Sequence, residues 1–244
     1  MRRPVSLARA LSKLGQCSRT QAFARIAAGR VSVNGRIGKD PSLRVSLEAD
    51  RIALDGQVAM ESREAVVIAF HKPVGCVTTR SDPQGRLTVY DLLPELDRFV
   101  FPVGRLDKET SGLLILTDDH RLGEALTNPK SQIPKTYELV VDGHLDEGAL
   151  QGLRRGLDIG KGERTMPATV SLLGGSRQVQ TLRLTIHEGK NRQVRRMLAA
   201  VGLKVLSLRR TAIGGLKLGL LPAGAHRLLS GSERRRLLET EFAA

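Results

Sequence analysis

The chain has 244 residues, 41% of them hydrophobic, which is enough for one large domain or two smaller domains with folded cores. Its formal net charge of +14 favours a polyanionic partner, nucleic acid before a membrane surface, because no apolar run approaches the roughly 18 residues that span a bilayer. The basic N-terminal residues lead into no apolar signal region, so we expect a cytoplasmic protein without a membrane partner.

The first domain that the pattern predicts covers residues 4–62. Apolar residues at helical spacing and two glycine stops predict two helices, and Ser18 has the character of an N-cap for the second. Asn34-Gly35 is a strong hairpin-turn signal. The expected elements in chain order are helix 5–14, helix 18–29, strand 31–33, strand and turn 50–56, and a polar linker at 57–65. This order predicts a small helix-rich α/β domain.

Basic side chains decorate this first domain. A charge run of this kind is often only a solvated face, but the net charge of the whole chain favours contact with RNA. The residues that we expect to bind RNA are Lys13, Arg19, Arg25 and Arg30.

The second predicted domain spans residues 66–236. Its expected elements are strand 66–70, strand 99–103, strand 113–116, helix 120–127, strand 137–141, helix 145–156, strands 170–173 and 181–186, helix 192–201, strand 204–208 and helix 230–238. Strands outnumber helices and rarely alternate with them. That arrangement is typical of an α+β fold with a mixed, largely antiparallel β-sheet flanked by helices.

A polar loop between two of these strands, residues 104–112, carries the first candidate for a reactive group. Leu106 stands beside Asp107 in this loop. A carboxylate next to an apolar anchor, held between rigid strands, is one way in which a scaffold positions a reactive side chain. An ordinary surface loop with solvated charges would explain the same residues.

Several motifs resemble those of a known family and occur in the order of that family. This resemblance favours a reactive role for the loop over an ordinary surface loop. Residues 103–119, Val-Gly-Arg-Leu-Asp-Lys-Glu-Thr-Ser-Gly-Leu-Leu-Ile-Leu-Thr-Asp-Asp, closely resemble the active-site signature of ribosomal RNA pseudouridine synthases of the RsuA/RluB type. The further motifs that resemble this family are His71–Gly75 (Lys-Pro-x-Gly), residues 81–89, Lys135–Tyr137 (Lys-x-Tyr) and residues 188–197. The first domain is similar to the RNA-binding domain named after ribosomal protein S-four.

The resemblance implies a reaction and a set of catalytic residues. The bond between ribose and uracil N1 breaks, the base turns, and C5 forms the new bond. This isomerisation needs no metal and no cofactor, and we expect none. Asp107 is the expected carboxylate, acting as nucleophile or as base, and Tyr137 is expected to stack on the base and relay the C5 proton. Arg195 is the expected cation beside Asp107, where it would keep the carboxylate ionised.

Other residues are assigned by resemblance to substrate binding. Arg105 would fill the space of the extruded base or grip its backbone, Leu208 would supply an apolar wall, and Arg192 and Arg196 would meet phosphates. Leu106 and Lys72 complete the expected substrate-binding set.

Residues 81–91 resemble the large-subunit enzymes of this family more than the small-subunit type, which implies a synthase that acts on large-subunit (23S) ribosomal RNA. A small-subunit (16S) enzyme, or a non-catalytic ribosome-assembly factor with the same fold, remains an alternative on the sequence alone. Cys17 and Cys76 fit no metal or redox spacing, so we expect reduced thiols. We expect the partner to be ribosomal RNA or an assembling ribosomal subunit. We expect a monomer, because the sequence shows no exposed apolar stripe that would bind a second copy.

Overall fold

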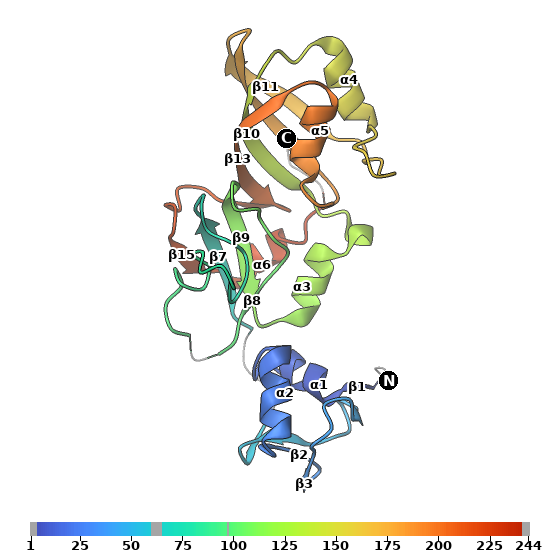
Figure 1. Ribbon diagram of the computed structural model, residues 1–244, viewed down its shortest axis with the longest axis vertical. Coiled ribbons are helices and arrows are strands. Elements are labelled where there is room, and N and C mark those ends of the chain that lie inside the picture. The colour runs from blue at the N-terminus through green and yellow to red at the C-terminus, as the bar shows by residue number, and fades with distance from the viewer. Residues whose placement is uncertain (1–3, 60–64, 97, 241–244) are drawn as a thin grey trace. The chain divides into compact units, whose positions relative to one another are not determined.

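The computed structural model describes residues 4–59, 65–96 and 98–240 (Figure 1). The chain divides into two compact units. The first contains residues up to 66 together with 95–101 and 117–120, and the second contains residues 67–94, 102–116 and those from 121 onward. The predicted linker lies partly outside the described residues. No helix in the described ranges is long and apolar enough to cross a bilayer.

The N-terminal part of the first unit combines two helices with short strands. Its elements are β1 (Val5–Ser6), α1 (Leu7–Lys13), α2 (Arg19–Ala27), β2 (Val31–Val33), β3 (Arg36–Ile37), β4 (Arg44–Val45), β5 (Ile52–Leu54) and β6 (Gln57–Val58). The predicted cap of α2 is confirmed: Ser18 Oγ accepts a hydrogen bond from the Gln21 amide, and the Ser18 amide donates one to Gln21 Oε1. Two details of the prediction are wrong, because Val5 pairs with Val45 as a strand and Gln57–Val58 extends the β5 hairpin.

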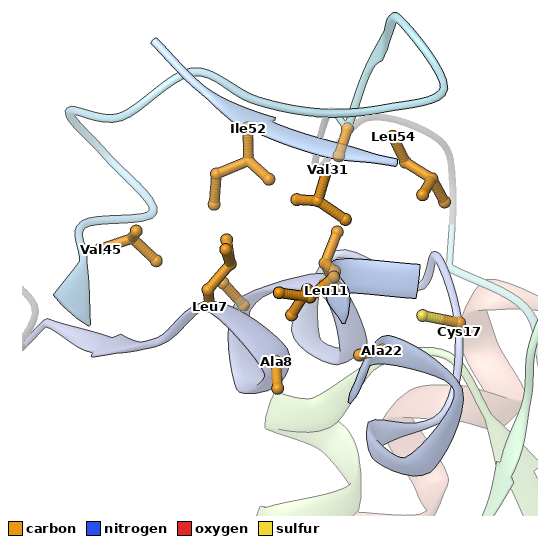
Figure 2. Packing of buried hydrophobic residues seen from close by; sticks show 12 residues of the cluster. Leu7, Ala8, Leu11, Cys17, Ala22, Val31, Val45, Ile52 and Leu54 are labelled. Carbon is orange, nitrogen blue, oxygen red and sulfur yellow. The ribbon is translucent and has the colours of Figure 1, made fainter. Parts of the chain in front are cut away.

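The core of this part lies between the two helices and a four-stranded sheet of order β3-β2-β5-β6 (Figure 2). Leu7, Leu11, Ile26, Val31 and Ile52 are all fully buried there. Because the apolar residues of the two helices recur at helical spacing, each helix turns a single face toward the sheet.

The second unit is built on a nine-stranded sheet. Its main order is β11-β12-β10-β13-β9-β7-β15, and β14 pairs with β13 while β8 pairs with β9. The strands are β7 (Val67–Lys72), β8 (Phe101–Pro102), β9 (Ser111–Thr117), β10 (Lys135–Asp142), β11 (Thr169–Gly175), β12 (Val179–Ile186), β13 (Lys204–Ile213), β14 (Leu216–Lys217) and β15 (His226–Leu228). Strand β13 runs parallel to β9 and antiparallel to β10, which confirms the predicted mixed sheet.

Helices flank this sheet as predicted. They are α3 (His120–Thr127), α4 (Glu147–Arg155), α5 (Gln193–Ala200) and α6 (Gly231–Arg236), with a 3₁₀ turn, η1, at Pro129–Ser131. Helix α5 packs on β13, and α4 packs on β11 (Figure 1). The prediction missed β14 and β15 and ended β13 five residues early. Their sequences are short or mixed, and β15 is held in the sheet by pairing with the distant strand β7.

Strands β9 and β13 approach each other very closely at Gly112. This residue pairs with Arg210 and has a φ of +111°, a backbone conformation that favours glycine. A Cβ atom added there would lie 2.2 Å from the Arg210 carbonyl oxygen. The glycine is therefore required by the junction between the two halves of the sheet.

We expect Gly112→Ala to lower the free energy of unfolding by about 2–4 kcal/mol, because it combines backbone strain with a clash against main chain that cannot move aside. Gly85→Ala is the matched control, since Gly85 has a φ of +67° but open space around it. It should cost about 1 kcal/mol or less. Urea unfolding of both variants measures the difference, and equal losses would show that the close approach is unimportant.

Candidate active site

The loop that carries Asp107 is held in place by backbone-directed hydrogen bonds. Lys72 Nζ donates to the carbonyl oxygens of Pro73 and Thr110 at 2.9 and 2.8 Å. Thr78 Oγ1 donates to the Leu106 carbonyl at 2.9 Å, and the Gly75 amide donates to the Lys108 carbonyl at 2.8 Å. Three of these bonds end on the loop itself, at Leu106, Lys108 and Thr110, and fix the position of the carboxylate before any substrate arrives.

A cleft of about 370 Å³ opens over this loop. It is lined by the loop, by strands β10 and β13, and by the segment that leads into α5. Seven of the predicted site residues line it together: Arg105, Leu106, Asp107, Tyr137, Arg192, Arg195 and Leu208. Residues that are up to 103 positions apart in the sequence thus share one concave surface, which is the usual form of a small-molecule or base-binding site.

The cleft has a buried floor and an exposed rim. Tyr137 and Leu208 are only 8% and 6% exposed and form an apolar, partly aromatic floor. The side chain of Asp107 is 31% exposed and that of Arg192 is 49% exposed. A flat apolar ring that enters this cleft would rest on the floor with a carboxylate at its edge.

Among the described ion pairs, Arg192 is the cation that pairs with Asp107, and the role predicted for Arg195 stays a prediction. Arg192 Nη1 lies 3.9 Å from Asp107 Oδ2 and 3.4 Å from Glu109 Oε2. Arg192 precedes α5 in a left-handed conformation, and its side chain extends to the loop. Arg195 lies on the next turn, where its guanidinium donates to the carbonyl oxygens of Glu109 and Val205 at 3.0 and 3.4 Å.

Glu109 reflects the same positive surroundings. A hydrogen bond from its own backbone amide, followed by the charge of Arg192, holds the pKa of Glu109 below its usual value. Glu109 stays outside the cleft lining, so Asp107 is the carboxylate of the loop that faces the cavity.

Two predicted substrate-binding residues lie outside the cleft lining. Lys72 is fully buried, and this burial lowers its pKa, so it supports the Asp107 loop and cannot reach a substrate. Arg196 donates to the carbonyl oxygens of Ile159 and Gly160 at 3.0 and 2.7 Å and forms an ion pair with Glu163. The side chain of Arg196 therefore fixes the chain before β11 and is not free to bind a phosphate.

Three charged cleft residues were given no role by the sequence reasoning, although Lys135 and Glu188 lie within the motifs. Glu188 is 7% exposed, accepts hydrogen bonds from the Met166 amide and Gln193 Nε2, and pairs with Lys190, which fixes the entry to α5. Lys135 and Arg210 line the floor. Lys135 could have been found from strand alternation, since it lies two residues before Tyr137, whereas Arg210 depends on the register of β13.

The predicted RNA-binding residues of the first unit differ in their surroundings. Arg19 is exposed, and Lys13 is half-buried. Arg25 donates to the Gln16 carbonyl at 3.2 Å, and Arg30 makes two hydrogen bonds of 2.7 Å to Asp55. Arg30 and Asp55 are both about half exposed, so this pair stays accessible to a competing anion.

Comparison with known proteins gives the same picture as the geometry. The model of the RNA pseudouridylate synthase family matches residues 66–200, and that of the S4 domain matches residues 5–59. The chain is 37% identical over 233 residues to "Ribosomal large subunit pseudouridine synthase B" of Bacillus subtilis, covering 95% of this chain and 94% of the relative. The protein of the same name from Yersinia pestis is 39% identical over 218 residues, covering 87% and 68% of the two chains.

A solved structure described as "Crystal structure of pseudouridylate synthase" is also similar, with a TM-score of 0.68 and 31% identity. The match covers 96% of this chain and 99% of that chain. The fold, the family model and the relatives agree with the resemblance that the motifs predicted. The chain belongs to the RNA pseudouridylate synthase family, with an S4 domain ahead of its synthase domain.

Proposed function

We propose that this protein converts one uridine of large-subunit ribosomal RNA to pseudouridine, and that it does so as a cytoplasmic monomer. The observation that carries the proposal is the cleft in which Asp107 stands beside Arg192, at the edge of a floor made by Tyr137 and Leu208. Two relatives named for the large subunit support the choice of RNA, and the match covers 94% of the one from Bacillus subtilis.

The cleft can accept only a base that has left its helix. Extrusion costs a few kcal/mol, and less in a loop. The floor residues Tyr137 and Leu208 would hold the flipped uracil by stacking and apolar contact, and Arg105 at the exposed rim would hold its backbone.

Asp107 acts on the sugar. Its carboxylate either attacks C1′ or removes the proton on C2′ as the bond from N1 to C1′ breaks. The base then turns so that C5 faces C1′ and forms the new bond. Tyr137 relays the proton that leaves C5, and Arg192 balances the charge of Asp107 in the free protein.

Substrate affinity would come from both units. Exposed Arg19 in the S4 domain and exposed Arg192 and Arg105 at the cleft rim meet phosphates, which makes binding dependent on salt. The target nucleotide is then selected by the shape of the RNA around it rather than by base stacking, since aromatic residues form only 3% of the chain.

We expect Asp107→Asn to abolish pseudouridine formation while RNA binding persists, because the amide can neither attack C1′ nor accept a proton. Carbodiimide primer extension on unmodified ribosomal RNA measures the product, and a filter-binding assay measures affinity. Glu109→Gln is the matched control, since this neighbouring carboxylate lies outside the cleft lining and should leave the product unchanged. Full activity in the Asn variant would remove Asp107 from the mechanism.

We expect Arg192→Gln to weaken RNA binding and to reduce the slope of log K against log salt by about 0.7–0.9, the value of one lost phosphate contact. Arg196→Gln should instead leave the slope unchanged and lower the melting temperature, because Arg196 is engaged with Ile159, Gly160 and Glu163. Affinity measured at salt concentrations from about 50 to 200 mM tests both variants, because phosphate contacts weaken strongly over this range. An identical slope for wild type and Arg192→Gln would contradict the phosphate role.

A further inference from the structure

Two cations on the cleft floor have no role in the mechanism above. Lys135 and Arg210 come from the adjacent strands β10 and β13. Arg210 is the cross-strand partner of Tyr137, and Lys135 lies two residues before Tyr137 on the same face of the sheet. Both cations are therefore neighbours of the ring on which the base would rest.

Neither cation has a counter-charge among the residues that the structure describes. Arg210 Nε donates to the Leu113 carbonyl at 2.8 Å, but its Nη2 atom is buried and has no hydrogen-bond partner. Lys135 Nζ donates only to the Ile133 carbonyl at 3.2 Å. Within the described residues, no carboxylate forms an ion pair with either. Burial, together with the charge of Arg210, lowers the pKa of Lys135 to about 8.

The two carboxylates that line the cleft are already engaged elsewhere. Asp107 lies near Arg192, and Glu188 is bound by Lys190, Gln193 and the Met166 amide. A buried cation without a partner is costly, and this cost is offset when a ligand brings negative charge to it. The floor is thus built for an anionic or strongly polar part of the substrate.

The depth of the floor cations in the cleft indicates which part of the substrate they contact. Arg210 is only 4% exposed, whereas the side chain of Arg192 at the rim is 49% exposed. A phosphate can meet the rim cations while it stays hydrated, but it would have to lose its water to reach the floor. The uracil ring is the part of the nucleotide that enters to this depth, and its carbonyl oxygens O2 and O4 are its most negative atoms.

We propose that Lys135 and Arg210 form a cationic subsite for the carbonyl edge of uracil and stabilise the base while it is detached from the sugar. This inference rests on the proposed function. When the bond from N1 to C1′ breaks, its electron pair stays with the ring and is shared by O2 and O4, while C1′ bonds to the Asp107 carboxylate or C2′ gives a proton to it. The ring charge disappears when C5 attacks C1′. In the same step the bond from C1′ to Asp107 breaks and releases the carboxylate, or the proton held by Asp107 returns to C2′. The C5 proton is then lost, and N1 gains one.

The subsite also explains how the base is retained while it turns. Two donors that face a delocalised charge can exchange O2 for O4 as the ring rotates, without losing either ion contact. Donors that are fixed in place before the reaction act only on the charge that the reaction creates, and they therefore raise the rate more than the affinity.

The test uses the full chain with Lys135→Met and Arg210→Gln. Removal of a preorganised donor of this kind lowers rates by about 10²–10³-fold, so we expect a loss of that order in the single-turnover rate at saturating RNA, with affinity unchanged. The charge-retaining variants Lys135→Arg and Arg210→Lys should recover part of the rate. Arg209→Gln is the matched control. Arg209 is the neighbour of Arg210 on β13, but it binds Glu138 and lies outside the cleft lining.

A second substrate tests the charge itself. RNA with 5-fluorouridine at the target carries a base whose anion is already stabilised by fluorine, so Lys135→Met should slow consumption of this base less than it slows uridine. A defect of equal size on both substrates would overturn the subsite. An unchanged single-turnover rate would also overturn it. Weaker and less salt-dependent binding with a normal rate at saturating RNA would overturn it as well, because that result marks a phosphate site.

Folding is checked by circular dichroism and thermal melting, and Lys135→Gln replaces Lys135→Met if the apolar side chain is not tolerated. The inference and the proposed function fail in different ways. Wild-type protein that forms no pseudouridine in ribosomal RNA removes the function, whereas active wild type with fully active floor variants removes only the subsite.

Discussion

The close junction of β9 with β13 at Gly112 is the constraint on which the site depends. This parallel pairing joins the strands β11-β12-β10-β13 to the strands β9-β7-β15 in one sheet. Gly112 follows the Asp107 loop, and its partner Arg210 is in turn the partner of Tyr137. One close backbone contact therefore brings the loop carboxylate to the floor of the cleft, because the register of β13 fixes both neighbours at once.

A β-bulge next to this junction sets the direction of the floor side chains. Between Tyr137 and Thr136 the pairing with β13 skips Thr211. An extra residue in one strand twists it locally and re-aims its side chains, and such bulges are common beside active sites. Here the bulge lies between Arg210, which lines the cleft, and the residues that pair with the start of β10.

Burial separates the many cations of this protein into different roles. Lys72 is fully buried and holds backbone carbonyls of the loop, Arg196 is tied to the chain before β11, and Arg192 is exposed at the rim. Arg210 is buried and only partly satisfied. The role that we propose for each of these cations, in structure, phosphate binding or base binding, thus follows from how much water it keeps and which acceptors surround it.

Much of the fold and of the site was determined by the sequence alone. Apolar periodicity, caps and glycine stops predicted α2, α3, α5 and most strands, and motif resemblance predicted the family and the set of residues around Asp107. Only the tertiary structure decided that Arg192 pairs with Asp107, that Lys72 is out of reach, and that Arg210 reaches the floor. The physical reason is that local patterns specify which face of an element is buried, whereas the partners of a long charged side chain depend on strand register and loop anchoring between distant segments.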